Sequence, residues 1–192
     1  MSLTTPKRFT IAEYHRLAEL GFFKENDRVE LIKGEIIQMA AKGTLHSVCS
    51  TRLYRELIKL VAEQAIVRGQ EPIIIGDDSE PEPDLAIVRN RADEYLEAHP
   101  SPSDVLLVIE ISNSTLKYDR DVKLSLYAEA GISDYWIFNL VDNYLECYSK
   151  HYQDLQGKFG YRHKFIYLSN ESVNLPYFTD LILDLSKVFP EY

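Results

Sequence analysis

Cysteine is scarce in this chain, and its scarcity excludes two kinds of site. Only Cys49 and Cys147 occur among the 192 residues, and no C-x-x-C pair exists. A thiolate metal site or a disulfide framework needs more cysteines at characteristic spacings. We therefore expect two buried free thiols, as in proteins of the reducing cytoplasm.

Long hydrophobic runs are also missing. The longest uninterrupted apolar run is "VLLVI" at residues 105–109, which is far too short to cross a bilayer. The N-terminal stretch "MSLTTPKRFT" contains no apolar signal core. These absences predict a cytoplasmic protein with no membrane partner.

Positive charge is in deficit. The chain has 21 Lys and Arg against 30 Asp and Glu, with a formal charge of -9. Domains that bind a nucleic acid duplex usually carry a basic patch, so stable unaided binding is not expected. The charge does not exclude a site that binds a divalent cation before it binds the nucleic acid. No G-x-G-x-x-G occurs, and "GKFG" at residues 157–160 is too short for a phosphate loop. We expect no nucleotide cofactor.

The residues that are present predict one domain over residues 1–192, because a chain of this length and apolar content can bury a single core. Thr10 and Glu13 match a capping box, which predicts a helix to about Leu20. Apolar residues at helical spacing predict a longer helix over residues 44–68, and a third helix is expected over residues 119–130 with Gly131 as its stop.

Strands are expected between and after these helices. The expected strand segments are a hairpin at residues 28–39 around Lys33-Gly34, short strands at 71–76, 84–89, 103–112 and 134–140, hairpin strands at 143–149 and 161–168, and a strand followed by a helical turn in 175–189. The order predicts a mixed α/β fold in which helices pack on a central sheet and extra β-hairpins are added.

Acidic residues crowd the start of one apolar strand. Asp77, Asp78, Glu80, Glu82 and Asp84 precede or open "LAIV". Like charges this close repel one another, so the crowding calls for a cause. A second anomaly is Glu110, the only charge in "VLLVIEI". A lone ionised carboxylate in a central strand is expensive unless it is paired or bound to a metal.

The two anomalies meet if the two strands are antiparallel. A register that pairs 84 with 110 also pairs 89 with 105, and it matches both apolar runs along their length. Directly opposed residues have Cβ atoms about 4.5–5.5 Å apart, so two carboxylates would converge at one edge of the sheet. Hard oxygen ligands of this kind suit Mg²⁺ or Mn²⁺. The alternatives are a turn residue at Asp84 and a salt bridge from Glu110 to an arginine.

Several stretches resemble one family. "PD" at Pro83-Asp84 followed by an apolar strand with Glu110 resembles the PD-(D/E)xK nuclease superfamily. The ordered set "VELIKGEI", "EPDLAIV", "VIEISNST", "YDRDVKLSLYAEAGISDYWI" and "LDLSKVF" is similar to the Uma2 family, also called DUF820, and covers nearly the whole chain. The resemblance implies a restriction-endonuclease-like core and Mg²⁺-dependent (or Mn²⁺-dependent) DNA cleavage, with Asp84 and Glu110 as metal ligands.

One position departs from the superfamily pattern. The pattern has lysine two residues after the glutamate, and here that residue is Ser112. Some branches of the superfamily supply the lysine from the following helix, which makes Lys123 the candidate. Lys123 lies one helical turn from Asp119 and from Tyr127. Lys117 is a weaker candidate, and a solvated lysine paired with Asp119 is the structural alternative for Lys123.

Two further residues complete the candidate catalytic set. The resemblance places Glu30, in "DRVELIKGEI", beside the metal, although an exposed hairpin carboxylate is equally compatible with the pattern. His46, in the first turn of the long helix, could assist water or phosphate, and packing is its alternative role. Glu80 and Glu82 are expected to stay in the loop, where they are either solvated or bind a second ion weakly.

The sequence therefore leads to two hypotheses. The first is a Mg²⁺-dependent endodeoxyribonuclease that hydrolyses phosphodiester bonds with activated water, and that forms a homodimer in order to cut both strands of DNA. The second is a non-catalytic module that keeps the nuclease fold and binds a protein or a nucleic acid. Ser112 at the usual lysine position is the main support for the second.

Overall fold

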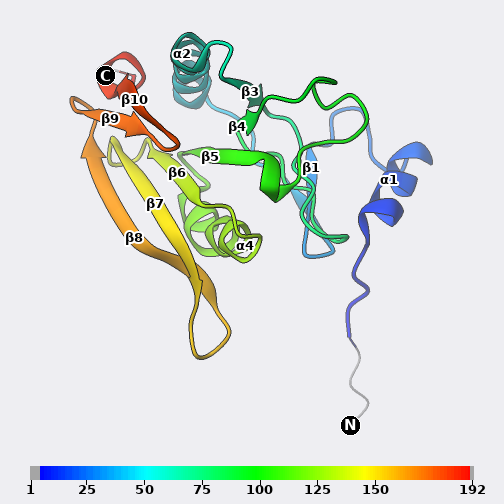
Figure 1. Ribbon diagram of the computed structural model, residues 1–192. Coiled ribbons are helices and arrows are strands. Elements are labelled where there is room, and N and C mark those ends of the chain that lie inside the picture. Colours follow the sequence, from blue (N-terminus) through cyan, green and yellow to red (C-terminus); the bar gives the residue numbers. More distant parts are fainter. Residues whose placement is uncertain (1–4, 191–192) are drawn as a thin grey trace.

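A six-stranded mixed sheet forms the middle of the structure, which is a computed structural model describing residues 5–190 (Figure 1). In sheet order the strands are β3 (Ala65–Gly69), β4 (Leu85–Arg89), β5 (Val105–Ser112), β6 (Asp134–Asn139), β7 (Tyr144–Gln153) and β8 (Phe159–Leu168). Only β5 and β6 pair in parallel, and the other neighbours are antiparallel. The expected mixed α/β fold is confirmed.

Both faces of this sheet are covered. Helix α2 (Thr44–Val61) lies above the sheet in Figure 1 and helix α4 (Leu124–Glu129) below it. Leu85 and Ile87 of β4 pack in the cluster that contains the apolar face of α2, whereas Ala86 and Val88 pack in the cluster that contains α4. Alternate residues therefore serve two cores, which is why these strands appear in the sequence as continuous apolar runs.

Smaller elements surround the sheet. Around it lie α1 (Ile11–Glu19), a hairpin of β1 (Val29–Ile32) and β2 (Glu35–Gln38), the 3₁₀ turn η1 (Pro102–Asp104), a hairpin of β9 (Ser172–Leu175) and β10 (Phe178–Asp184), and the 3₁₀ turn η3 (Leu185–Lys187). The capping box of Thr10 and Glu13 is confirmed, as are the hairpin around Lys33-Gly34 and the C-terminal strand and turn. Strand β9 was not predicted.

The predicted pairing of the two acidic strands is confirmed at one end and wrong at the other. Leu85 pairs with Ile109 in antiparallel register, which places Asp84 across from Glu110. The register then shifts between Ile87 and Val88, so that Val88 faces Val105. Leu106 is the extra residue of this β-bulge, and the predicted pairing of 89 with 105 is off by one.

Two other predicted elements are also wrong. The long helix ends at Val61 instead of near residue 68, and β3 occupies Ala65–Gly69. Residues 71–76 form no named strand. Their amides bond to loop carbonyls, Ile73 N–H to Pro81 and Ile74 N–H to Pro100, and only Ile75 forms a single bridge, to Ser79.

The connection from β5 to β6 is a composite helix. It begins with one turn, α3 (Leu116–Tyr118), continues through a π-helical turn, η2 (Asp119–Lys123), and ends in α4. Gly131 follows with φ 78°, which confirms the expected glycine stop. Both cysteines are buried and free, as predicted. Within residues 5–190 no helix is long and apolar enough to cross a membrane.

Candidate active site

A cleft of about 460 Å³ opens where the strand ends of β4 and β5 meet the composite helix, the β1–β2 hairpin and the beginning of α2. All five residues predicted for the site line this cleft: Glu30, His46, Asp84, Glu110 and Lys123. They come from five different segments of the chain, so the fold assembles them. Each is at least nine-tenths buried.

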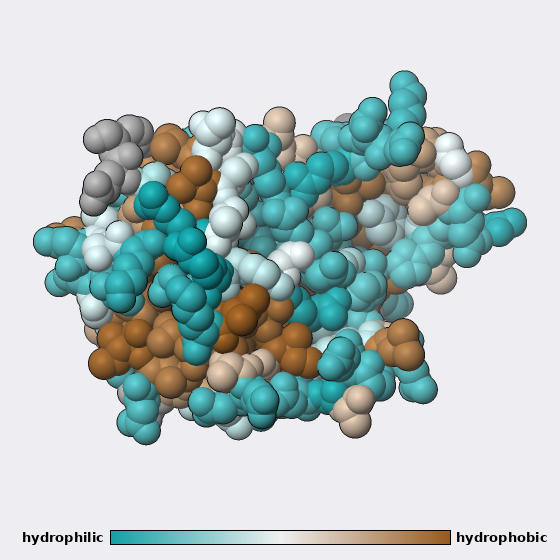
Figure 2. All heavy atoms as spheres, turned by 90° about the horizontal axis from the view of Figure 1, so that it is seen from above, coloured by the Kyte–Doolittle hydropathy of each residue, from teal (hydrophilic) through white to brown (hydrophobic). Residues whose placement is uncertain are grey.

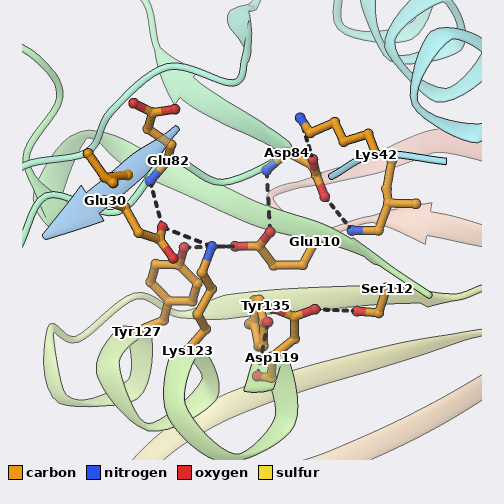
Figure 3. Close-up of polar contacts among 12 residues, drawn as sticks. Glu30, Lys42, Glu82, Asp84, Glu110, Ser112, Asp119, Lys123, Tyr127 and Tyr135 are labelled. Carbon is orange, nitrogen blue, oxygen red and sulfur yellow. Dashed lines mark hydrogen bonds and ion pairs between the residues drawn. The ribbon is translucent and has the colours of Figure 1, made fainter. Parts of the chain in front are cut away.

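Glu110 is placed by the pleat of β5. Its neighbours Ile109 and Ile111 pack on the α2 side, and Glu110 projects to the α4 side. There its Oε1 accepts hydrogen bonds from Lys123 Nζ at 3.0 Å and from the Tyr127 hydroxyl at 2.9 Å (Figure 3). Burial raises the pKa of Glu110 to about 8, although the positive charge of Lys123 acts to lower it. A further cation near Glu110 would favour its ionised form.

Lys123 is the cationic centre of this cluster. Its Nζ lies 3.0 Å from Glu110 Oε1 and 3.1 Å from Glu30 Oε2. Burial by itself lowers the pKa of Lys123, but the carboxylates around it outweigh burial and raise the pKa above its ordinary value. The ammonium therefore stays charged at neutral pH. The alternative of a solvated lysine paired with Asp119 is wrong, because Lys123 is only 5% exposed.

Asp119 and Lys123 both reach the buried face, and both lie in the π-helical turn. A wider turn changes the angular spacing of side chains, and π-turns occur often at functional sites. Asp119 is held by the Ser112 hydroxyl, which donates to its Oδ2 at 2.7 Å. Lys117, the weaker candidate, points to solvent and pairs with Asp121, so it does not line the cleft.

Asp84 is held from three sides. The Ile111 N–H donates to its Oδ2 at 2.9 Å, His46 Nε2 lies 2.9 Å from the same oxygen, and Lys42 Nζ lies 3.2 Å from Oδ1. Burial works against ionisation of Asp84, but the hydrogen bond and charge of His46, the charge of Lys42 and the Ile111 N–H lower its pKa overall. An ionised carboxylate can only accept, so His46 donates through Nε2.

Glu30 and its neighbours close the cluster on the hairpin side. Glu30 Oε2 accepts from the backbone N–H of Glu82 at 3.2 Å, in addition to its ion pair with Lys123. Glu30 is 3% exposed, so the alternative of an exposed hairpin carboxylate is wrong. Glu82 is half-buried and lines the cleft. The prediction of a solvated loop fails for Glu80, which is buried and lies 2.7 Å from His15 Nε2.

The donor set fits a divalent cation. Among residues 5–190, the polar contact of Asp84 Oδ1 is with Lys42, and that of Glu110 Oε2 is a 3.4 Å contact with the Asp84 N–H, so each carboxylate keeps one weakly engaged oxygen. Hard oxygen ligands are those that Mg²⁺ and Mn²⁺ prefer. Within the described part of the chain, no three His, Cys, Asp or Glu side chains converge as a ready-made metal site. Two protein ligands completed by water or substrate are typical of Mg²⁺.

Sequence reasoning missed Lys42 and Tyr118, and both line the cleft. Lys42 lies in the loop before α2, where a single lysine among small residues gives no signal. Tyr118 lies at the start of the composite helix, and its hydroxyl is buried without a hydrogen-bond partner. Only the tertiary fold brings either residue to Asp84 and Glu110.

Comparison with known proteins identifies a structure with the same fold and a matching family. A crystal structure described as "a putative nuclease belonging to DUF820" from Anabaena variabilis ATCC 29413 superimposes with a TM-score of 0.72. The match covers 94% of this chain and 97% of that chain at 16% sequence identity, so the likeness is one of fold. No curated protein matches the sequence. The model of the Uma2 family, described as "Putative restriction endonuclease", matches residues 11–186. The chain belongs to the Uma2 family.

Proposed function

We propose that this protein is a metal-dependent endonuclease that hydrolyses phosphodiester bonds of DNA. The observation that carries the proposal is the convergence of Asp84, Glu110 and Lys123 at one buried point of a cleft. Membership of the Uma2 family supports the same activity. Perturbed ionisable groups gathered in a cleft are typical of catalytic sites.

Asp84 and Glu110 would hold the cation through their weakly engaged oxygens. A bound Mg²⁺ or Mn²⁺ supplies Lewis-acid stabilisation of negative charge on the phosphate and makes bound water more acidic. The cleft needs such a cation before DNA can enter. Even with Glu110 protonated, the carboxylates that line the cleft outnumber its two lysines and one histidine, so without a metal it repels phosphate; the acidic residues are Glu30, Glu82, Asp84, Glu110 and Asp119.

Lys123 contributes charge and position. Because its pKa is raised, it keeps its proton at neutral pH and does not act as a base. Its ammonium can orient the attacking water and stabilise the negative charge that develops at phosphorus. Glu30 positions the ammonium through its ion pair at 3.1 Å. The water oxygen forms the new bond to phosphorus, the bond to one ester oxygen breaks, the water proton passes to solvent, and the leaving oxygen takes up a proton from solvent to become a hydroxyl.

His46 and the oligomeric state complete the proposal. His46 fixes the orientation of Asp84 through its Nε2 hydrogen bond, which is the role of a positioning residue. A homodimer would present two symmetric sites to the two strands of a duplex.

Plasmid cleavage tests the activity, and two lysines of the composite helix provide a matched pair. We expect the wild type to nick supercoiled DNA with Mg²⁺ or Mn²⁺. Lys123→Met should reduce the rate by about two orders of magnitude or more, because it removes a buried charge from the reacting phosphate. Lys117→Met removes an exposed lysine that is also paired with a carboxylate, and it should cleave like the wild type.

The fold of each variant is checked by circular dichroism, and Asp84→Asn serves as a second inactive variant of unchanged size. Equal loss in both lysine variants would contradict the assignment of Lys123. A folded wild type that binds the metal but cleaves neither duplex nor single-stranded DNA would favour the non-catalytic binding module.

A further inference from the structure

Four buried side-chain polar atoms in residues 5–190 have no hydrogen-bond partner. Three of them belong to residues that line the cleft: Lys42 Nζ, His46 Nδ1 and Tyr118 Oη. A buried donor without an acceptor costs free energy, so such groups are rare in native proteins and call for a reason. Lys42 Nζ and the Tyr118 hydroxyl can both donate, so their position in one cleft points to a ligand that accepts hydrogen bonds.

Lys42 is the most informative of the three. Its Nζ is 3.2 Å from Asp84 Oδ1, close enough for an ion pair but without the alignment of a hydrogen bond. The Lys42 ammonium has three donors and, apart from this ion pair with Asp84, no partner within residues 5–190 engages them. In Figure 3, Asp84 stands between Lys42 and the Glu110–Lys123 pair. Lys42 therefore belongs to the opposite side of the candidate cation site from the catalytic lysine.

The N-terminus of α2 adds to the positive character of that side. Gly43 is the N-cap, no side chain caps the helix, and its first turn has no acidic residue. The helix is 18 residues long, and its uncapped N–H groups and dipole favour an anion. His46, 8% exposed, lies in the same first turn and lines the cleft with Nδ1 unpaired.

We propose that Lys42 and the beginning of α2 form a binding subsite for a backbone phosphate of the substrate. The proposal rests on the proposed function, because it takes the ligand to be a phosphodiester. A cation held by Asp84 and Glu110 repels the Lys42 ammonium, which then turns to the phosphate. The subsite sets where the DNA backbone lies relative to the cation. Lys42 is the residue of the subsite whose side chain binds the phosphate.

The alternative is that Lys42 only neutralises Asp84. The two roles differ in what removal of the ammonium does to metal affinity. If Lys42 only supports Asp84, its loss disturbs the carboxylate and weakens metal binding. If Lys42 holds phosphate, its loss removes a competing cation from Asp84, so metal affinity is kept or increased while DNA affinity falls.

The test compares Lys42→Met, Lys42→Arg and the control Lys117→Met with the wild type. Fluorescence anisotropy of a short labelled DNA duplex is measured with Ca²⁺ in place of Mg²⁺, and a gel confirms that the duplex stays intact. We expect Lys42→Met to weaken binding about tenfold, as for loss of one charged hydrogen bond. The slope of log K against log salt should fall by about 0.9, one phosphate contact.

The other variants and a metal titration complete the test. Lys42→Arg should recover most of the affinity, Lys117→Met should match the wild type, and Lys42→Met should bind Mn²⁺ at least as tightly as the wild type. Unchanged duplex affinity and slope in Lys42→Met would overturn the subsite, as would a wild type that does not bind the duplex. Parallel losses of DNA and Mn²⁺ affinity would overturn it too. DNA binding through Lys42 without plasmid cleavage would keep the subsite and reject the nuclease proposal.

Discussion

Ser112 has a structural role at the position where the PD-(D/E)xK pattern has lysine. Its hydroxyl donates to Asp119 Oδ2 at 2.7 Å, and Ser112 and Asp119 are 0% and 3% exposed. The bond ties the end of β5 to the π-helical turn that carries Lys123. Lys123 thus reaches the cleft from the helix, and Ser112 anchors that helix to the end of β5.

Removal of this bond should destabilise the fold. Ser112→Ala leaves the buried Asp119 carboxylate short of one donor, so we expect the free energy of unfolding to fall by about 1–2 kcal/mol. Ser114→Ala is the matched control, because Ser114 lies in the following loop and is exposed. Urea denaturation measures both. Equal stability of the two variants would show that the Ser112–Asp119 bond has no net effect.

Single residues were predictable where they conflict with their local sequence. Glu110 is a charge in an apolar strand, and Asp84 belongs to a crowd of acids, so both could be singled out without a structure. Lys123 needed the family resemblance as well as its helical spacing. Lys42 could not be predicted, because its burial and its contact with Asp84 depend on residues far away in the sequence.

At the scale of elements, the early end of α2 is the main error of the sequence-based prediction. Ala62 follows the last helical residue with φ 45° and ψ -120°, a conformation that side chains with a Cβ disfavour. No glycine or proline marks this point, and so periodicity alone extended the helix. The chain turns here because Ala65 must enter β3, whose pairing with β4 decides the boundary.

This strained residue leads to a stability prediction. Ala62→Gly should raise the free energy of unfolding by about 0.5–1 kcal/mol, because glycine adopts positive φ without a steric penalty. Ala18→Gly is the opposite control: it lies on the exposed face of α1, where glycine should cost about 0.5–1 kcal/mol. Thermal denaturation compares both with the wild type. An Ala62→Gly variant that melts below the wild type would show that Ala62 is not strained.

The β-bulge and the π-turn were also beyond prediction, for a related reason. The β-bulge adds one residue to β5, and the π-turn is one residue wider than an α-helical turn. Both depend on packing on the two sides of the sheet. Leu106 joins the α2-side cluster as its neighbour Leu107 does, which strict alternation does not allow. The turn Asp119–Lys123 brings two charges to the same buried cluster. The antiparallel pairing itself was predictable, because two apolar runs bounded by acids match in only one direction.

For the whole molecule, the two-sided core determined the class of fold, and the sequence carried that information in its apolar runs. The acidic balance determines how a substrate can approach. Figure 2 shows hydrophilic side chains over much of the upper surface, and a hydrophobic area on the left half, where Figure 1 places α2 and β8–β10. On the proposed function, a net charge of -9 would make close approach of DNA depend on cations bound in the cleft.

Metal binding is therefore the most direct test of the account. The measurement is a calorimetric titration of Mn²⁺ into the wild type, into Glu110→Gln and into the control Asp121→Asn, whose exposed carboxylate lies on the same composite helix outside the cleft. We predict binding to the wild type and the control, and its loss in folded Glu110→Gln, because one of the two ligand carboxylates is gone. A well-folded wild type that binds no Mn²⁺, even with DNA present, would contradict the metal site and the nuclease proposal built on it.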